Sequence, residues 1–117
     1  MAKILVVDDA SFMRIKIANM LKKSGHEIIQ AENGQIAVEK YKSDSPQIVF
    51  MDITMPVKNG IEALKEIIDF DKSAKVIMLS NEAQQERIME AIQCGAKKFI
   101  AKPFDDEKII SCLNELL

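Results

Sequence analysis

Short, uninterrupted apolar runs alternate along the chain with segments in which apolar residues recur every three or four positions. The runs are rich in β-branched residues and too short for helices, which indicates strands buried on both faces. These strands are predicted at residues 3–7, 27–30, 47–51, 75–79 and 98–101. The second run is partly polar, so we expect it at an edge of the sheet.

Helices are predicted after each strand from the spacing of apolar positions. They cover residues 11–24, 33–41 and segments that include 61–68, 88–92 and 109–116. Five strand–helix units in strict alternation predict an α/β fold, with a parallel sheet covered by helices on both faces. No linker, repeat or change of composition interrupts the pattern, so residues 1–117 are expected to form one domain.

Composition narrows the classes of function. Apolar residues make up 48% of the 117 residues and the formal net charge is −2, so the chain lacks the basic surface of a nucleic-acid-binding domain. No apolar run is long enough to cross a membrane, and no apolar signal segment precedes the first strand, so we expect a cytoplasmic location. Cys94 and Cys112 are far apart with no histidine nearby, which favours reduced thiols over a metal site or a disulfide.

Polar residues whose side chains can take part in catalysis or metal binding follow four of the five predicted strands. Asp8 and Asp9 follow the first strand, Asp52 the third, Ser80 the fourth and Lys102 the fifth. Open parallel sheets bind ligands beyond the carboxyl ends of their strands, so these side chains are expected at one rim. Taken singly, Asp9 or Asp52 is equally well explained as a helix N-cap. The combination at four strand ends favours a functional site.

Three neighbouring carboxylates cannot all ionise without cost, and one is pushed toward protonation unless a cation binds. Magnesium suits one or two carboxylates together with waters and phosphate oxygens. A carboxylate such as Asp52 can attack phosphorus, while Lys102 neutralises the phosphoryl oxygens and Ser80 donates a hydrogen bond. The chemistry predicted from the residues is therefore magnesium-dependent phosphoryl transfer to an aspartate.

The motifs resemble those of the receiver domains of bacterial two-component response regulators, especially the stand-alone chemotaxis type. The resemblance covers essentially the whole chain. It is carried by the segments Val6-Val7-Asp8-Asp9, Met51-Asp52-Ile53-Thr54-Met55-Pro56, Asn59-Gly60 and Lys102-Pro103-Phe104, together with Ser80. It implies a flavodoxin-like (βα)5 three-layer sandwich whose parallel strands have the order 2-1-3-4-5.

The resemblance also implies roles for the site residues. Asp52 is the expected phosphoacceptor, and Ser80 and Lys102 are expected to contact the phosphoryl group. Magnesium is expected on the side chains of Asp9 and Asp52. The remaining implied metal contacts are the backbone carbonyl of Thr54 and, through water, Asp8. A cis peptide bond is implied between Lys102 and Pro103.

A conformational switch is implied as well. In relatives the hydroxyl on the fourth strand moves toward the phosphate and an aromatic residue on the fifth strand turns inward, which here are Ser80 and Phe99. The implied partner face comprises the fourth helix, fifth strand and fifth helix and includes Ile88, Phe99 and Cys112. An alternative for Phe99 is a plain core aromatic, because alternation along a strand can bury it permanently.

Some positions depart from the common pattern of the family. Phe99 replaces a frequent tyrosine, so a contact that needs the tyrosine hydroxyl is missing. Asn81 stands where a small residue is usual, which affects the opening of the site. Thr54 and Glu82 stand where relatives tune the lifetime of the phosphate, so that lifetime does not transfer to this chain.

The expected function is a phosphoacceptor signalling switch, not an enzyme acting on a separate substrate. The expected partners are a histidine kinase as phosphodonor and, because no output domain is visible, a downstream protein. That protein is a flagellar-switch component in chemotaxis, which the context of Met13 and Thr54-Met55 favours, or the next phosphotransfer protein in a phosphorelay. We expect a monomer that binds no nucleic acid and does not insert into a membrane.

Two rival classes fit less well. A magnesium-dependent phosphatase with an aspartyl nucleophile should carry a general acid two residues after the nucleophile, where this chain has Thr54. A flavodoxin-like cofactor binder needs a phosphate-binding loop after the first strand, where Asp8 and Asp9 would repel phosphate. Sustained turnover of p-nitrophenyl phosphate would favour the first class, and a yellow colour on purification the second.

Overall fold

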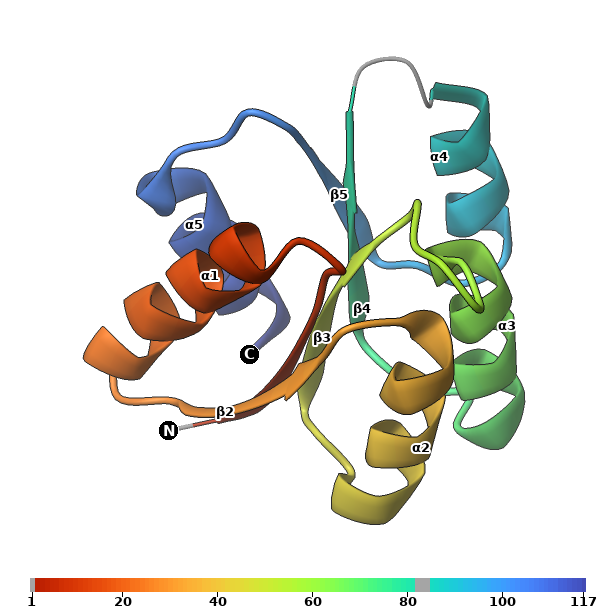
Figure 1. Ribbon diagram of the computed structural model, residues 1–117, viewed down its shortest axis with the longest axis horizontal. Coiled ribbons are helices and arrows are strands. Elements are labelled where there is room, and N and C mark those ends of the chain that lie inside the picture. The colour runs from red at the N-terminus through yellow and green to blue at the C-terminus, as the bar shows by residue number, and fades with distance from the viewer. Residues whose placement is uncertain (1, 82–84) are drawn as a thin grey trace.

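The computed structural model describes residues 2–81 and 85–117 and contains one five-stranded sheet with five helices (Figure 1). The elements alternate along the chain in the following order: β1 (Lys3–Val7), α1 (Ser11–Lys23), β2 (Glu27–Ala31), α2 (Gly34–Asp44), β3 (Ile48–Asp52), α3 (Gly60–Phe70), β4 (Val76–Ser80), α4 (Gln85–Gln93), β5 (Lys98–Ala101) and α5 (Asp106–Leu116). The α/β class and the alternation predicted from the sequence are confirmed.

The sheet is parallel throughout, with the order β2-β1-β3-β4-β5. This order confirms the flavodoxin-like topology. The partly polar strand β2 lies at one edge, as its composition predicted, and its residues are mostly half-buried or exposed. β1, β3 and β4 lie inside the sheet and their residues are almost all buried, which explains their continuous apolar runs.

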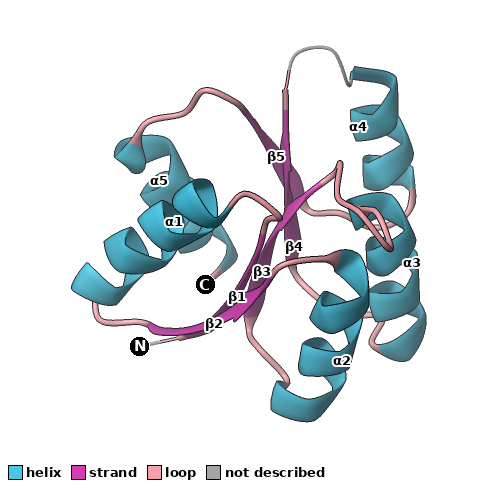
Figure 2. Ribbon diagram, viewed as in Figure 1, coloured by secondary structure: helices cyan, strands magenta, loops and turns pink. Residues whose placement is uncertain are grey.

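The helices form a layer on each face of the sheet (Figure 2). α1 and α5 cover one face, and α2, α3 and α4 cover the other. Successive residues of β1 enter different cores: Ile4 and Val6 pack toward α1 and α5, whereas Leu5 and Val7 pack toward α2, α3 and α4. This period-two alternation is the property of a strand that lets one apolar run fill two cores.

β3 and β4 each end one residue later than the apolar runs predicted. Asp52 is the last residue of β3 and pairs with Leu79, and Ser80 is the last residue of β4 and pairs with Ala101. The predicted places of Asp52 and Ser80 after their strands are therefore corrected by one position. The backbone of a polar residue can still join the ladder, which a hydrophobic run does not reveal.

Two other expectations about the chain can be compared with the structure. Cys94 is half-buried and Cys112 is buried, and both are free thiols. Among the described residues, no helix combines the length and the apolar character needed to span a bilayer.

Candidate functional site

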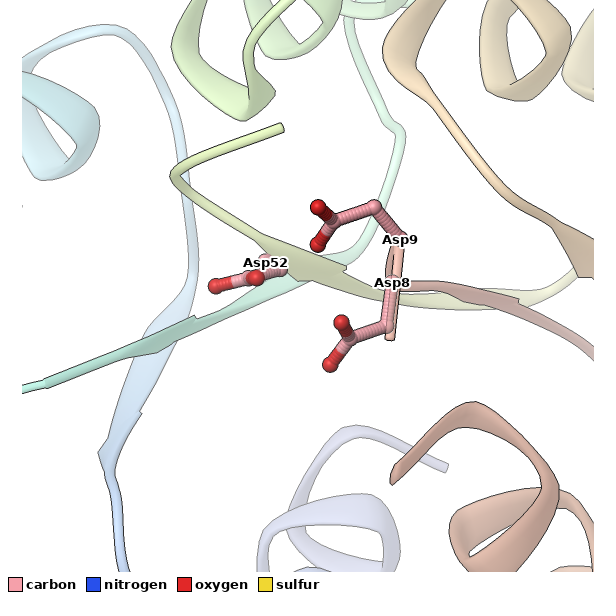
Figure 3. A group of neighbouring side chains, drawn as sticks. All are labelled: Asp8, Asp9 and Asp52. Carbon is pink, nitrogen blue, oxygen red and sulfur yellow. The ribbon is translucent and has the colours of Figure 1, made fainter. Parts of the chain in front are cut away.

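Three carboxylates lie together where β1 and β3 end (Figure 3). Asp8 and Asp9 follow β1, and Asp52 closes β3. One carboxylate oxygen from each lies within 4.8 Å of the other two. Asp8 and Asp52 are buried and Asp9 is exposed, so the cluster has an inner wall and an open side. The cluster predicted at this rim is therefore present.

Lys102, which directly follows β5, bridges the two buried carboxylates. Its Nζ lies 3.3 Å from Asp8 Oδ2 and 3.4 Å from Asp52 Oδ1. The second oxygen of Asp8, Oδ1, accepts a hydrogen bond of 2.9 Å from the backbone N–H of Ala10. The peptide bond between Lys102 and Pro103 is cis, as the resemblance implied.

The electrostatics of the cluster separate Asp52 from an ordinary aspartate. Burial raises the pKa of Asp52 to about 6, and the charges of Asp8 and Asp9 add to the rise, while Lys102 opposes it. One member of the cluster is thus pushed toward protonation, as three neighbouring carboxylates predict. A divalent cation would remove this penalty, and three carboxylates beside an open side are a donor set that suits magnesium.

Ser80, the last residue of β4, is another buried polar residue of the site. Its side chain is fully buried, and its hydroxyl has no hydrogen-bond partner among the residues that the structure describes. The carbonyl of Ser80 accepts the backbone N–H of Lys102 at 2.6 Å, which keeps the ends of β4 and β5 together. Buried hydroxyls normally have a partner, so this one is available to a group that enters the site.

The loop from β3 to α3 is held close to Asp52. The backbone N–H of Gly60 donates to the carbonyl of Ile53 at 2.7 Å, and a Cβ on Gly60 would lie 2.0 Å from the carbonyl oxygen of Asp52. Only glycine allows this approach. Asn59 caps α3 and forms a capping box with Glu62, so the helix begins directly behind the site.

The same loop turns sharply at Val57. Lys58 N–H donates to Pro56 O at 2.7 Å, two residues back, and Val57 has a φ of 68°. A β-branched residue rarely adopts a positive φ, so the backbone is strained here. Thr54, the predicted backbone ligand, precedes this turn, and its side chain is exposed.

A profile of the response regulator receiver domain matches residues 4–114. The chain belongs to this family.

Several relatives resemble this receiver domain over nearly their whole length. Chemotaxis protein CheY of Bacillus subtilis is 52% identical over 98% of this chain and 97% of its own length. Chemotaxis protein CheY of Thermotoga maritima is 49% identical over 97% of this chain and 96% of its own. Among solved structures, Vibrio cholerae chemotaxis protein CheY4 is 30% identical with a TM-score of 0.93, covering 100% of this chain and 99% of that one.

The two residues predicted for the switch of this receiver domain differ in their exposure to solvent. Ser80 is fully buried, whereas Phe99, on the edge strand β5, is 45% exposed. The alternative of a permanently buried core aromatic is therefore wrong. Asn81 is exposed. Glu82, which was expected to affect the phosphate lifetime, lies outside the described residues.

The predicted partner face needs a correction at two positions. Ile88 is 8% exposed and Cys112 is 5% exposed, because each faces a core of the receiver domain. Their side chains therefore cannot form an accessible surface in this conformation. Among the described residues of the same region, the exposed large apolar side chains are Met89 and Ile92 on α4, together with Phe99.

Sequence reasoning missed one contact behind the acidic cluster. Arg14, on α1, donates from Nη1 to the carbonyl of Asp8 at 2.8 Å and from Nε to Gln30 Oε1 at 3.1 Å. An arginine one turn into the helix after an acidic pair offers only a weak signal, because most arginines at such positions are solvated. The pairing with Gln30 depends on how α1 packs over β2.

Proposed function

We propose that this receiver domain, residues 1–117, is a phosphoacceptor switch of a two-component system that takes a phosphoryl group onto Asp52. The observation that carries the proposal is the surrounding of Asp52. A buried carboxylate ends a central strand, with a lysine ammonium 3.4 Å away and two further carboxylates beside it. Family membership supports the same conclusion.

In the proposed reaction, a carboxylate oxygen of Asp52 attacks the phosphorus of a phosphohistidine on a histidine kinase. An O–P bond to Asp52 forms as the P–N bond breaks, and the histidine nitrogen takes the electron pair of that bond. Asp9 and Asp52, the carbonyl of Thr54 and, through water, Asp8 would hold magnesium, which when bound neutralises negative charge at the phosphoryl oxygens.

The remaining residues act on the phosphoryl group. Lys102 lies against Asp8 and Asp52, so its ammonium can follow the new negative charge with little movement. The buried hydroxyl of Ser80 gains the acceptor that it lacks among the described residues when a phosphoryl oxygen arrives. Movement of Ser80 toward that oxygen would give Phe99 room to leave its exposed position, and the face around α4, β5 and α5 would change.

We further propose that the output is protein contact in chemotaxis, with a flagellar-switch component as partner and a cytoplasmic location. The names of the relatives from Bacillus subtilis and Thermotoga maritima support chemotaxis. Met89, Ile92 and Phe99 supply exposed apolar area for such a contact. The alternative, transfer of the phosphoryl group to another histidine protein, would use the open side of the site at Asp9 instead.

The test is labelling with radioactive acetyl phosphate in the presence of magnesium. Wild-type protein should take up one acid-labile phosphate, and Asp52→Asn should take up none. Asp69→Asn, which changes an exposed carboxylate on α3, should label like the wild type. Full labelling of Asp52→Asn would overturn the assignment, and sustained turnover of p-nitrophenyl phosphate would favour a phosphatase.

A second experiment separates the two outputs. Labelled protein is mixed with a purified flagellar-switch component or with a purified phosphotransfer protein. Chemotaxis output predicts phosphorylation-dependent binding to the first and no loss of label to the second. Rapid transfer of the label to the phosphotransfer protein would favour the phosphorelay.

A further inference from the structure

Arg14 connects the acidic turn after β1 to the edge strand β2. Its guanidinium donates to the carbonyl of Asp8 at 2.8 Å and to the side-chain oxygen of Gln30 at 3.1 Å. Both contacts are partly buried. Within residues 2–81 and 85–117, no carboxylate lies at ion-pair distance from Arg14. The guanidinium therefore donates to a neutral carbonyl and to a neutral amide.

The contact at the Asp8 carbonyl fixes a particular peptide plane. That carbonyl belongs to the peptide bond between Asp8 and Asp9, so its direction also sets the direction in which Asp9 leaves the backbone. The same turn is held by Asp8 N–H to Ala31 O at 3.2 Å and by Ala10 N–H to Asp8 Oδ1 at 2.9 Å. Arg14 is the one side chain outside the turn that holds the carbonyl of this peptide among the described hydrogen bonds.

We infer that Arg14, oriented by Gln30, is a positioning residue that holds the Asp8–Asp9 peptide so that both carboxylates point into the cation site. This inference rests on the proposed function, because it concerns the magnesium site of the phosphoacceptor. The planar fork of arginine suits the role, since it makes two hydrogen bonds in fixed directions. Partners of this kind typically contribute 10- to 100-fold to metal affinity.

Position and charge predict opposite results when Arg14 is removed. A positive charge near the cluster repels a cation, so loss of that charge alone should tighten magnesium binding. Loss of the hydrogen bond to Asp8 should weaken magnesium binding, because part of the binding free energy is then needed to align the carboxylates. The sign of the change in magnesium affinity therefore separates the two roles.

The test is calorimetric titration of magnesium into wild-type protein and variants. Arg14→Ala should weaken binding by roughly 10-fold or more. Arg14→Lys should also bind magnesium weakly, because lysine keeps the positive charge but lacks the planar pair of N–H donors of the guanidinium. Gln30→Ala should weaken binding less than Arg14→Ala. The double variant should bind no more weakly than Arg14→Ala, because Gln30 acts only through Arg14.

Lys40 provides a matched control. It lines the same surface hollow as Arg14 and Gln30, and its Nζ donates to the carbonyl of Gln30. Among the residues that the structure describes, no hydrogen bond or ion pair joins Lys40 to Asp8 or Asp9. Lys40→Ala should leave magnesium affinity unchanged or slightly tighter. Melting curves in EDTA accompany each titration, and Gln30→Ala serves as the test variant if Arg14→Ala does not fold.

Three outcomes would overturn the inference. They are wild-type or tighter magnesium binding in Arg14→Ala, full recovery in Arg14→Lys, and a loss in Lys40→Ala as large as that in Arg14→Ala. Absence of magnesium binding by the wild-type protein would be a different failure. It would overturn the proposed function, and this inference with it.

Discussion

Replacing Asp52 with asparagine is expected to stabilise the protein at neutral pH when no divalent cation is present. Burial raises the pKa of Asp52 from 3.8 to about 6, with Asp8 and Asp9 adding to the rise and Lys102 opposing it. In the unfolded chain the carboxyl ionises near its ordinary pKa. Ionising Asp52 is therefore harder in the folded protein, and asparagine removes that cost while keeping the shape of the side chain.

The size and the pH range of the effect follow from the two pKa values. Their difference corresponds to about 3 kcal/mol when the cost is complete. Well below pH 3.8 the carboxyl is protonated in both folded and unfolded chains, and the cost is absent. It grows as the pH rises and is complete above a pH of about 6. The substitution should thus raise the free energy of unfolding by about 3 kcal/mol at pH ~7.5 and by about 1 kcal/mol at pH ~4.5.

Urea unfolding followed by circular dichroism measures this difference, with EDTA present at both pH values. Asp69→Asn is the control, because Asp69 is exposed and, among the described residues, forms just a surface ion pair with Lys72 at 3.6 Å. Its effect should stay within about 0.5 kcal/mol at both pH values. No gain in Asp52→Asn, or a gain of the same size at both pH values, would refute the reasoning. Added magnesium should narrow the gap in the free energy of unfolding, because the wild type keeps the full set of proposed ligands and is stabilised more than Asp52→Asn.

Three further substitutions test other parts of the site. Ser80→Ala removes a buried hydroxyl that lacks a partner among the described residues, so it should raise the free energy of unfolding by up to about 1 kcal/mol in urea while slowing acetyl phosphate labelling; a clear loss of stability would contradict this. Gly60→Ala places a Cβ 2.0 Å from the carbonyl oxygen of Asp52 and should cost roughly 2–4 kcal/mol in the same assay, and a neutral result would show that the loop moves freely. Val57→Asn should raise the melting temperature, gaining about 1 kcal/mol, because Val57 has a φ of 68° with an exposed side chain, and asparagine adopts positive φ more easily. A lower melting temperature would refute the strain argument.

Much of the fold could be predicted from the sequence because its signals are local. Each buried strand appears as an apolar run, and the polar character of β2 marks it as an edge strand. The rim on which Asp52 and Lys102 meet follows from the parallel direction of the strands. The correct strand order was predicted on another basis, because it came from the family resemblance and not from the pattern of residues.

Other features depend on packing that no local pattern encodes. The resemblance placed Ile88 and Cys112 in the partner face, but both side chains are buried in this conformation. The apolar stripes of α4 and α5 alone do not show which of their residues face the core. The exposed place of Phe99 reflects its strand at the sheet edge. The contact between Arg14 and Gln30 joins a helix to a strand, and the local sequence of neither segment predicts it.

The site contains two buried polar groups that are in an unfavourable environment in the conformation described. Asp52 has a raised pKa, and the Ser80 hydroxyl has no partner among the described residues. A cation and a phosphoryl group would relieve both at once, so their binding free energy is linked to the conformation of the strand ends. A ligand can shift an equilibrium only through such a difference between two states. The strained residue Val57 lies on the loop between Asp52, the last residue of β3, and α3. A site built in this way favours a switch over a permanently filled metal centre.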